Sequence, residues 1–204
     1  MTQTVALAFT GASGMPYGVR LLECLLAADR HVYLLYSQVA QVVARQEMDL
    51  ALPARARDAE EFFVARFGAR PGQLRAFGRE EWFAPVASGS NPPEAMVVCP
   101  CSMGGLAAIA NGLSDNLIER AADVMLKEAR KLVLVPRETP FSAIHLENML
   151  RLARAGAVIL PANPGFYHRP KSVDEVVDFI VARVLDQLGV PHQLMARWGA
   201  EPNH

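Results

Sequence analysis

The chain has 204 residues, three cysteines and a formal net charge of −1 at pH 7. One domain accommodates this length, and its core needs no disulfide. The balanced charge argues against a general basic surface for nucleic acid, and an odd number of cysteines in apolar surroundings is typical of a reducing cytoplasm. No apolar run approaches the length that spans a bilayer, so the hydrophobic fraction of 51% is expected in a core or at subunit interfaces.

Apolar runs and helical patterns alternate along the chain. The runs predict strands at Val5–Phe9, Val32–Tyr36, Ala95–Cys99, Leu132–Val135 and Ala157–Leu160. The segments between and after them predict helices at Tyr17–Ala28, Gln38–Gln46, Ala59–Phe67, Met103–Ala110, Ile118–Lys127, Ile144–Arg154 and Val173–Leu188. This alternation indicates an α/β fold, a flavodoxin-like or Rossmann-like three-layer sandwich around a central parallel sheet.

Two segments fall outside this alternation. Residues 69–93 are rich in glycine, proline, serine and asparagine, and we expect a surface excursion there. Residues 1–189 are expected to form the domain. The tail, residues 190–204, is expected to pack near the active site or on a neighbouring subunit.

Small, hydroxylic or charged residues follow every predicted strand. They are Gly11-Ala12-Ser13, Ser37, Pro100–Gly105, Pro136–Thr139 and Pro161–Pro164. Ligands of open parallel sheets bind at the carboxyl ends of the strands. The five strand ends together therefore predict a ligand site, whereas the glycine turn alone would indicate only a tight connection.

The first strand end, TGASG at 10–14, favours a mononucleotide. The Gly-Lys-Ser/Thr of a P-loop is absent, and no acidic residue follows the second strand to hold the ribose of a dinucleotide. The phosphate of FMN needs backbone amides, hydroxyls and an arginine. Ser13, Ser37, Ser102 and Arg137 supply such groups.

Other chemistries find little support. Cys101 has no histidine near it in sequence, so a buried structural thiol is favoured over a nucleophile. The five histidines are scattered and Cys99-x-Cys101 lacks a second pair, so we expect no metal site.

The sequence resembles the flavin prenyltransferase (UbiX) family of FMN-binding proteins. The matching segments are TGASG at 10–14, Ser37, the block from Pro100 to Glu128, and the block from Leu132 to Gly189 that contains VPRETP and NPGFYHRPKSVDE. Gly105 is a departure, because a threonine is common there and one hydroxyl near the flavin is then missing.

The resemblance implies an activity. This family joins the dimethylallyl group of dimethylallyl monophosphate to N5 and C6 of reduced FMN. The product, prenylated FMN, serves a partner decarboxylase in ubiquinone synthesis or aromatic-acid decarboxylation. The resemblance also implies a cytoplasmic homo-oligomer, often a dodecamer, with active sites at subunit interfaces.

The resemblance places flavin contacts at Gly11, Ala12, Ser13, Ser37, Ser102, Met103, Gly104, Gly105 and Arg137. It places Tyr167 and Arg183 on the phosphate of the allyl donor, with Arg120 and Lys127 from a neighbouring subunit.

Catalytic roles follow from the same resemblance. Ser13, Glu47 and, less directly, Glu138 match positions suited to acid–base work. Ionising an allylic phosphate leaves a carbocation, which an aromatic face stabilises. Trp198 is the expected aromatic residue, and Trp82 is the alternative.

Two other functions stay open on the sequence. An FMN-dependent decarboxylase of cysteinyl peptides needs a histidine base, which the segment Gln38–Gln46 lacks. A flavin carrier would keep the FMN pocket, but it has no use for Tyr167, Arg183 and Arg120.

Overall fold

The computed structural model describes residues 3–195, and within them six parallel strands form one sheet in the order β3-β2-β1-β4-β5-β6. The strands are β1 (Thr4–Phe9), β2 (His31–Tyr36), β3 (Leu74–Phe77), β4 (Ala95–Cys101), β5 (Lys131–Pro136) and β6 (Val158–Ile159). The helices are α1 (Met15–Ala27), α2 (Gln38–Met48), α3 (Ala56–Phe67), α4 (Met103–Ala110), α5 (Leu117–Lys127), α6 (Ala143–Arg154) and α7 (Val173–Leu188), with a 3₁₀ turn, η1 (Pro85–Ala87). The α/β class and the parallel sheet are confirmed.

The strand β3 departs from the expected surface excursion over residues 69–93. Leu74–Phe77 pairs in parallel with β2 at the edge of the sheet. The five expected strands alone would stand in the 2-1-3-4-5 order of a flavodoxin, and β3 extends the sheet to 3-2-1-4-5-6. Four residues behind a Pro-Gly pair are too short a run for periodicity to detect.

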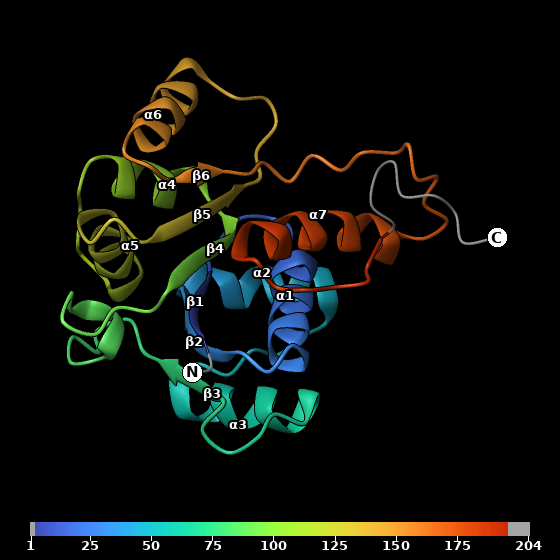
Figure 1. Ribbon diagram of the computed structural model, residues 1–204, viewed down its shortest axis with the longest axis horizontal. Coiled ribbons are helices and arrows are strands. Elements are labelled where there is room, and N and C mark those ends of the chain that lie inside the picture. The colour runs from blue at the N-terminus through green and yellow to red at the C-terminus, as the bar shows by residue number, and fades with distance from the viewer. Residues whose placement is uncertain (1–2, 196–204) are drawn as a thin grey trace.

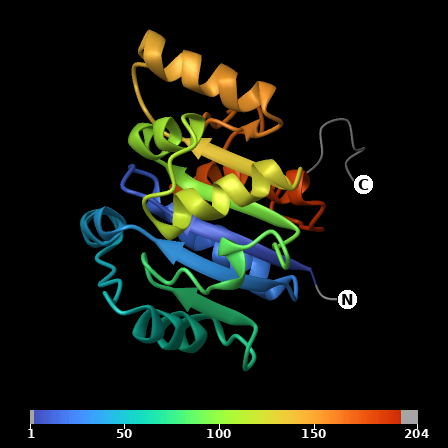
Figure 2. The same ribbon diagram turned by 90° about the vertical axis from the view of Figure 1, so that its left-hand side faces the viewer.

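Helices cover both faces of the sheet (Figure 1). On one face of the sheet, Val5, Leu7 and Phe9 of β1 belong to the core formed with α1, α2, α3 and α7. On the other face, Ala6 and Ala8 belong to the core formed with α4, α5 and α6. Figure 2 faces the layer of α4, α5 and α6. Burial on both faces explains why the strands are nearly continuous apolar runs.

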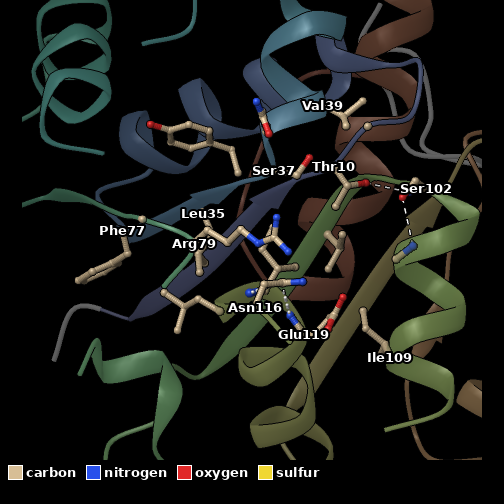
Figure 3. A pocket seen from close by; sticks show the side chains of 18 residues that line it. Thr10, Leu35, Ser37, Val39, Phe77, Arg79, Ser102, Ile109, Asn116 and Glu119 are labelled. Atoms are coloured by element: carbon tan, nitrogen blue, oxygen red, sulfur yellow. Dashed lines mark hydrogen bonds between the residues drawn. The ribbon is translucent and has the colours of Figure 1, made fainter. Parts of the chain in front are cut away.

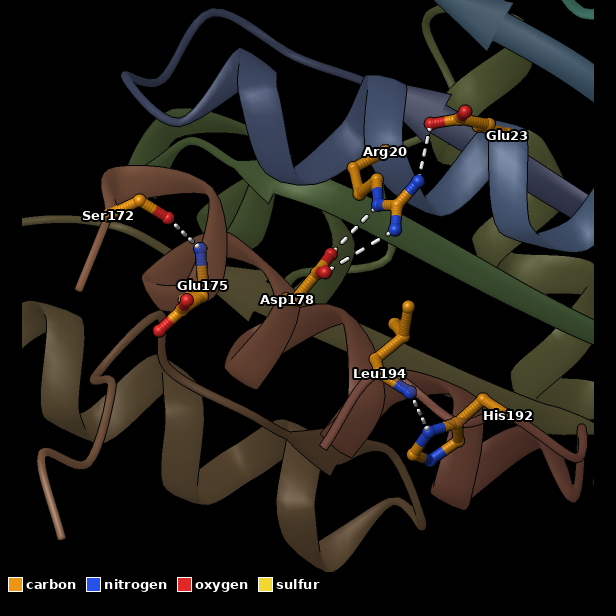
Figure 4. A network of polar contacts seen from close by, with 7 residues as sticks. All are labelled: Arg20, Glu23, Ser172, Glu175, Asp178, His192 and Leu194. Carbon is orange, nitrogen blue, oxygen red and sulfur yellow. Dashed lines mark hydrogen bonds and ion pairs between the residues drawn. The ribbon is translucent and has the colours of Figure 1, made fainter. Parts of the chain in front are cut away.

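Helices α1 and α7 lie side by side, and a polar network joins them (Figure 4). The Arg20 guanidinium donates to both carboxylate oxygens of Asp178, with N–O distances of 2.8 and 3.3 Å, and to Glu23 at 2.8 Å. Helix α1 also packs closely against β4. A Cβ at Gly18 would lie 2.4 Å from the carbonyl oxygen of Cys99, so only glycine allows this approach.

The tail is described as far as Met195. Val190 is buried, and Leu194 and Met195 pack partly buried on the core beneath α7. Within residues 3–195, no helix combines the length and the apolar character that a bilayer crossing requires.

Candidate active site

A cavity of about 290 Å³ opens at the carboxyl ends of β1, β2 and β4, where the order of the strands reverses (Figure 3). Its walls are apolar at Leu35, Val98 and Ile109. Its polar groups come from the strand ends, from the loop after β3 and from the start of α5: Thr10, Ser37, Arg79, Ser102, Asn116 and Glu119. An apolar cavity with a few convergent polar groups at this edge of the sheet is the usual form of a ligand site.

Three helices begin at this cavity, and the N-cap residue of each lines it. The hydroxyl of Ser37 accepts from the amide of Ala40 at α2, and that of Ser102 accepts from the amide of Gly105 at α4. The side chain of Asn116 caps α5. Helix N-termini carry partial positive charge, so the cavity favours an anionic group such as a phosphate.

The N-terminus of α1 is not open in this way. The carboxylate of Glu47 accepts from the amide of Gly14 at 2.9 Å and from that of Met15 at 2.9 Å. The amides that the sequence offered as a phosphate turn are therefore taken by a side chain of the protein. This contact brings Glu47 to the turn that carries Ser13, and the catalytic roles expected for the two residues stay a prediction.

The glycine turn after β1 packs tightly against α2. A Cβ at Gly11 would lie 2.5 Å from Cγ1 of Val39, so a larger residue does not fit. Ala12 is buried, and Ser13 is exposed. Arg137, at the end of β5, donates from Nε to the carbonyl oxygen of Ser13 at 3.2 Å, which joins two expected flavin contacts.

The first residues of α4 expose backbone, and few side chains, to a ligand. Met103 is buried in the core, while Gly104 is exposed, and a Cβ added there would meet no heavy atom within 4 Å. A Cβ at Gly105 would lie 3.3 Å from the Ser102 hydroxyl. This is closer than an ordinary van der Waals contact, so a side chain at Gly105 would press on the N-cap residue of α4.

Tyr167 and Arg183 lie on the same side of α7. The ring of Tyr167 packs edge-on against Phe179, with centroids 5.8 Å apart, and Phe179 stands one turn before Arg183. Arg183 pairs with Asp186 at 2.7 Å, and the other carboxylate oxygen of Asp186 contacts His192 at 3.2 Å.

Arg120 and Lys127 lie in the opposite layer, on α5. Arg120 donates to the carbonyl oxygen of Ala87 at 3.0 Å and pairs with Asp123 at 2.8 Å, and Lys127 pairs with Glu128. One chain does not bring them to Tyr167 and Arg183, so their convergence needs a second subunit and stays a prediction.

The remaining expected catalytic residues are less well placed. Glu138 accepts from the amide of Thr139 at 3.1 Å, and within residues 3–195 it forms no ion pair with Arg137 or Lys127. Trp198 lies outside the described residues. Trp82 stands in the loop after β3 and is half exposed.

The buried thiols are unsuited to nucleophilic chemistry. Burial raises the pKa of Cys101 to about 12 and raises that of Cys99 as well, so both stay protonated at neutral pH. No group of three histidine, cysteine, aspartate or glutamate side chains gathers as metal ligands in the described part of the chain.

Among the polar residues of the cavity, Thr10, Arg79, Asn116 and Glu119 were missed in the sequence. Arg79 follows the unexpected strand β3, and its carbonyl oxygen accepts from the amide of Leu117 at 2.9 Å. Asn116 could have been found, because Asn116-x-x-Glu119 before an apolar run has the form of a capping motif. Thr10 was noticed only as the first letter of the glycine turn.

Residues 1–185 match the Flavoprotein family. The chain is 57% identical over 199 residues to the flavin prenyltransferase UbiX of Pseudomonas aeruginosa, covering 98% of this chain and 95% of that protein. It is 50% identical over 190 residues to UbiX of Alkalihalophilus pseudofirmus, covering 93% of each.

Solved structures agree. AnUbiX in complex with FMN and dimethylallyl pyrophosphate superposes with a TM-score of 0.87 and 37% identity, over 99% of this chain and all of that one. A dodecameric FMN-dependent UbiX-like decarboxylase from Escherichia coli O157:H7 gives 0.84 and 42%, over 97% of this chain and all of that one. A PPC decarboxylase, at 16% identity and a TM-score of 0.56, shares only the fold. The chain therefore belongs to the Flavoprotein family and, within it, to the UbiX flavin prenyltransferases.

Proposed function

We propose that this protein is a flavin prenyltransferase that joins the dimethylallyl group of a dimethylallyl phosphate to N5 and C6 of reduced FMN. The observation that carries the proposal is the 57% identity to the prenyltransferase of P. aeruginosa along 98% of the chain. AnUbiX, which matches 99% of the chain, was solved with both FMN and an allyl donor.

The cavity fits a flavin mononucleotide. Its apolar walls suit a flat ring system, and its hydroxyls, helix N-termini and the guanidinium of Arg79 suit a phosphate. When bound, reduced FMN supplies the nucleophilic positions N5 and C6. The chain's part is to hold the ring, exclude water and accept the protons that these positions release.

Ser13 and Glu47 are the proposed proton acceptors. The two amide groups of Gly14 and Met15 hold the Glu47 carboxylate beside the Ser13 turn, and Arg137 holds the carbonyl group of Ser13 from the other side. A carboxylate and a hydroxyl in fixed positions can accept and relay a proton. Glu138, which contacts only its own turn here, has a smaller proposed role.

The donor phosphate is proposed to lie between subunits. Tyr167 and Arg183 would bind it from one chain, and Arg120 and Lys127 from the next, in a homo-oligomer like the dodecamer of the E. coli relative. Several cations stabilise the charge of the leaving phosphate. Trp198 is the proposed aromatic face for the allyl group.

The product would serve a separate decarboxylase in the cytoplasm, in ubiquinone synthesis or aromatic-acid decarboxylation. The relatives named UbiX flavin prenyltransferase support this role.

The test is anaerobic incubation of the protein with reduced FMN and an allyl donor, followed by mass analysis of the flavin. Dimethylallyl monophosphate and dimethylallyl pyrophosphate form the two arms. We expect the flavin to gain the mass of one isoprene unit with the monophosphate. An unchanged flavin in both arms contradicts the proposal. Bound but unchanged flavin would indicate a carrier, and release of carbon dioxide from a peptide with a C-terminal cysteine would indicate the decarboxylase.

A further inference from the structure

A buried hydroxyl joins the two turns that line the cavity. Thr10 is only 6% exposed, and its Oγ1 donates to the carbonyl oxygen of Pro100 at 2.7 Å. The same oxygen accepts from the amide of Ser102 at 2.8 Å (Figure 3). The backbone amide of Thr10 also donates to Pro100 at 3.2 Å. One residue thus holds together segments that are 90 positions apart in the chain.

The two segments are the ones that the flavin is expected to contact. Thr10 leads directly into Gly11, Ala12 and Ser13, and Ser102 leads into Met103, Gly104 and Gly105. Ser102 passes the connection on, because its hydroxyl accepts from the amide of Gly105 at 3.2 Å and so starts α4. The hydroxyl of Thr10 therefore connects the first turn to the start of α4.

We propose that Thr10 is a positioning residue for the flavin, acting through the turn at Gly11–Ser13 and the start of α4; this inference rests on the proposed function. Its hydroxyl makes one donated and one accepted hydrogen bond within the protein, so it orients its neighbours and is not itself a group for the chemistry. Removing it leaves the partly buried amide of Ser102 without this partner and loosens the connection between the two turns.

A purely structural role makes a different prediction. If the hydroxyl only stabilised the fold, its loss would lower stability and leave flavin affinity unchanged in the folded protein. Gln73 offers the comparison. It is 4% exposed, and its Nε2 donates to the carbonyl oxygens of Leu26 at 2.8 Å and Arg30 at 3.3 Å. Gln73 precedes β3, at the opposite end of the sheet from the cavity.

The experiment compares Thr10→Val, Thr10→Ser and Gln73→Met with the wild-type protein. Valine keeps the shape and loses the hydroxyl, and serine keeps the hydroxyl. FMN affinity is measured by quenching of flavin fluorescence, stability by urea unfolding, and prenylation by KM for FMN and kcat separately. We expect Thr10→Val to raise the Kd and the KM for FMN by about tenfold, which is the effect of one lost buried hydrogen bond. Thr10→Ser should restore the affinity, and Gln73→Met should lower stability without changing the Kd.

Each outcome separates the two claims. Unchanged FMN affinity in Thr10→Val overturns the inference and leaves the proposed function standing. An equal loss of affinity in Gln73→Met also overturns it, because the effect would then come from general destabilisation. An equal loss in Thr10→Ser overturns it too, because keeping the hydroxyl would then not keep the affinity. A wild-type protein that binds no FMN contradicts the proposed function and the inference together.

Discussion

Glu47 closes the N-terminus of α1 by accepting a hydrogen bond from the amide of Met15 at 2.9 Å. The same carboxylate accepts from Gly14 at 2.9 and 3.2 Å, and Gly14 adopts a left-handed conformation with φ of 113°. The helix cap is thus supplied by a residue 32 positions later, at the end of α2. The carboxylate proposed for proton transfer is held in place by the turn on which Ser13 stands.

Replacing Glu47 with glutamine should affect both roles. The amide keeps one acceptor oxygen but no charge, so the free energy of unfolding should fall by about 1 kcal/mol. Loss of the proton acceptor should lower the rate of flavin prenylation by about a hundredfold while FMN still binds. Urea unfolding, FMN titration and the anaerobic assay measure the three quantities.

A matched control for this variant is Glu60→Gln, since Glu60 on α3 accepts from the backbone amide of Ala76 in β3 at 2.9 Å and does not line the cavity. It should lose similar stability and keep its activity. If both variants prenylate equally well, Glu47 is a cap without a catalytic role.

Asp178 on α7 is expected to stabilise the fold through its ion pair with Arg20 on α1. The double contact with Arg20 is partly buried, with side chains 35% and 21% exposed, and the hydrogen bond to Asp178 is the main cause that raises the pKa of Arg20. Asp178→Asn should lower the free energy of unfolding by about 1 kcal/mol.

The exposed pair Arg57–Glu61 on α3 is the control for this measurement. Glu61→Gln should change the free energy of unfolding by at most about 0.5 kcal/mol. Equal effects in the two variants would mean that burial adds nothing to the α1–α7 contact.

Much of the fold could be predicted because a parallel sheet leaves a strong pattern. Strands buried on both faces are continuous apolar runs, and five of them were found near their true positions. The edge strand Leu74–Phe77 could not be found in this way. It has four residues, one of which, Arg75, is exposed, and its place beside β2 is decided by contacts with α3 and β2. The strand β6 is shorter than the run Ala157–Leu160 because only Val158 and Ile159 pair with β5.

The site could be predicted where it depends on strand ends. The carboxyl ends of parallel strands lie at one edge of the sheet, so Ser37 and Ser102 line one cavity. Their positions do not depend on the conformation of the loops. Contacts set by loops could not be predicted. The position of Arg79 depends on β3, and the bond from Thr10 to Pro100 spans 90 residues with no spacing rule behind it.

Arg183 is predicted to act on the allyl donor and not on the flavin. It is exposed on α7, one turn after the Phe179 ring on which Tyr167 packs, and it does not line the cavity. Arg183→Ala should therefore keep the Kd for FMN and lower kcat/KM for the donor by about tenfold to a hundredfold, as expected for one lost charge-assisted contact.

Arg57→Ala, which removes another exposed arginine from a helix, is the control for Arg183 and should prenylate normally. Normal turnover in Arg183→Ala would show that the phosphate of the donor binds elsewhere. Weakened FMN binding in that variant would place Arg183 at the flavin.

Stability should fall in alkaline solution because two thiols are fully buried. Burial raises the pKa of Cys101 to about 12 and raises that of Cys99, whereas a thiol of the unfolded chain titrates at about 8.5. Below about pH 8.5 the thiols are protonated in the folded and in the unfolded chain, so the free energy of unfolding is not reduced by their titration. Above it the unfolded chain releases the proton first, so the free energy of unfolding falls by about 1.4 kcal/mol per pH unit for each thiol, until the pH reaches the pKa of the folded state.

Urea unfolding between about pH 8 and pH 10 measures this slope. Cys101→Ala should be less stable at every pH because it leaves a small cavity, but its stability should decline less steeply than that of the wild type. The difference in slope, and not the difference in stability, reports the thiol. Cys24→Ala should flatten the decline as well, because burial raises the pKa of the Cys24 thiol to about 11, above the range of this measurement. Equal slopes in the wild type and Cys101→Ala would mean that the Cys101 thiol titrates as it does in the unfolded chain, which its complete burial beneath the cavity argues against.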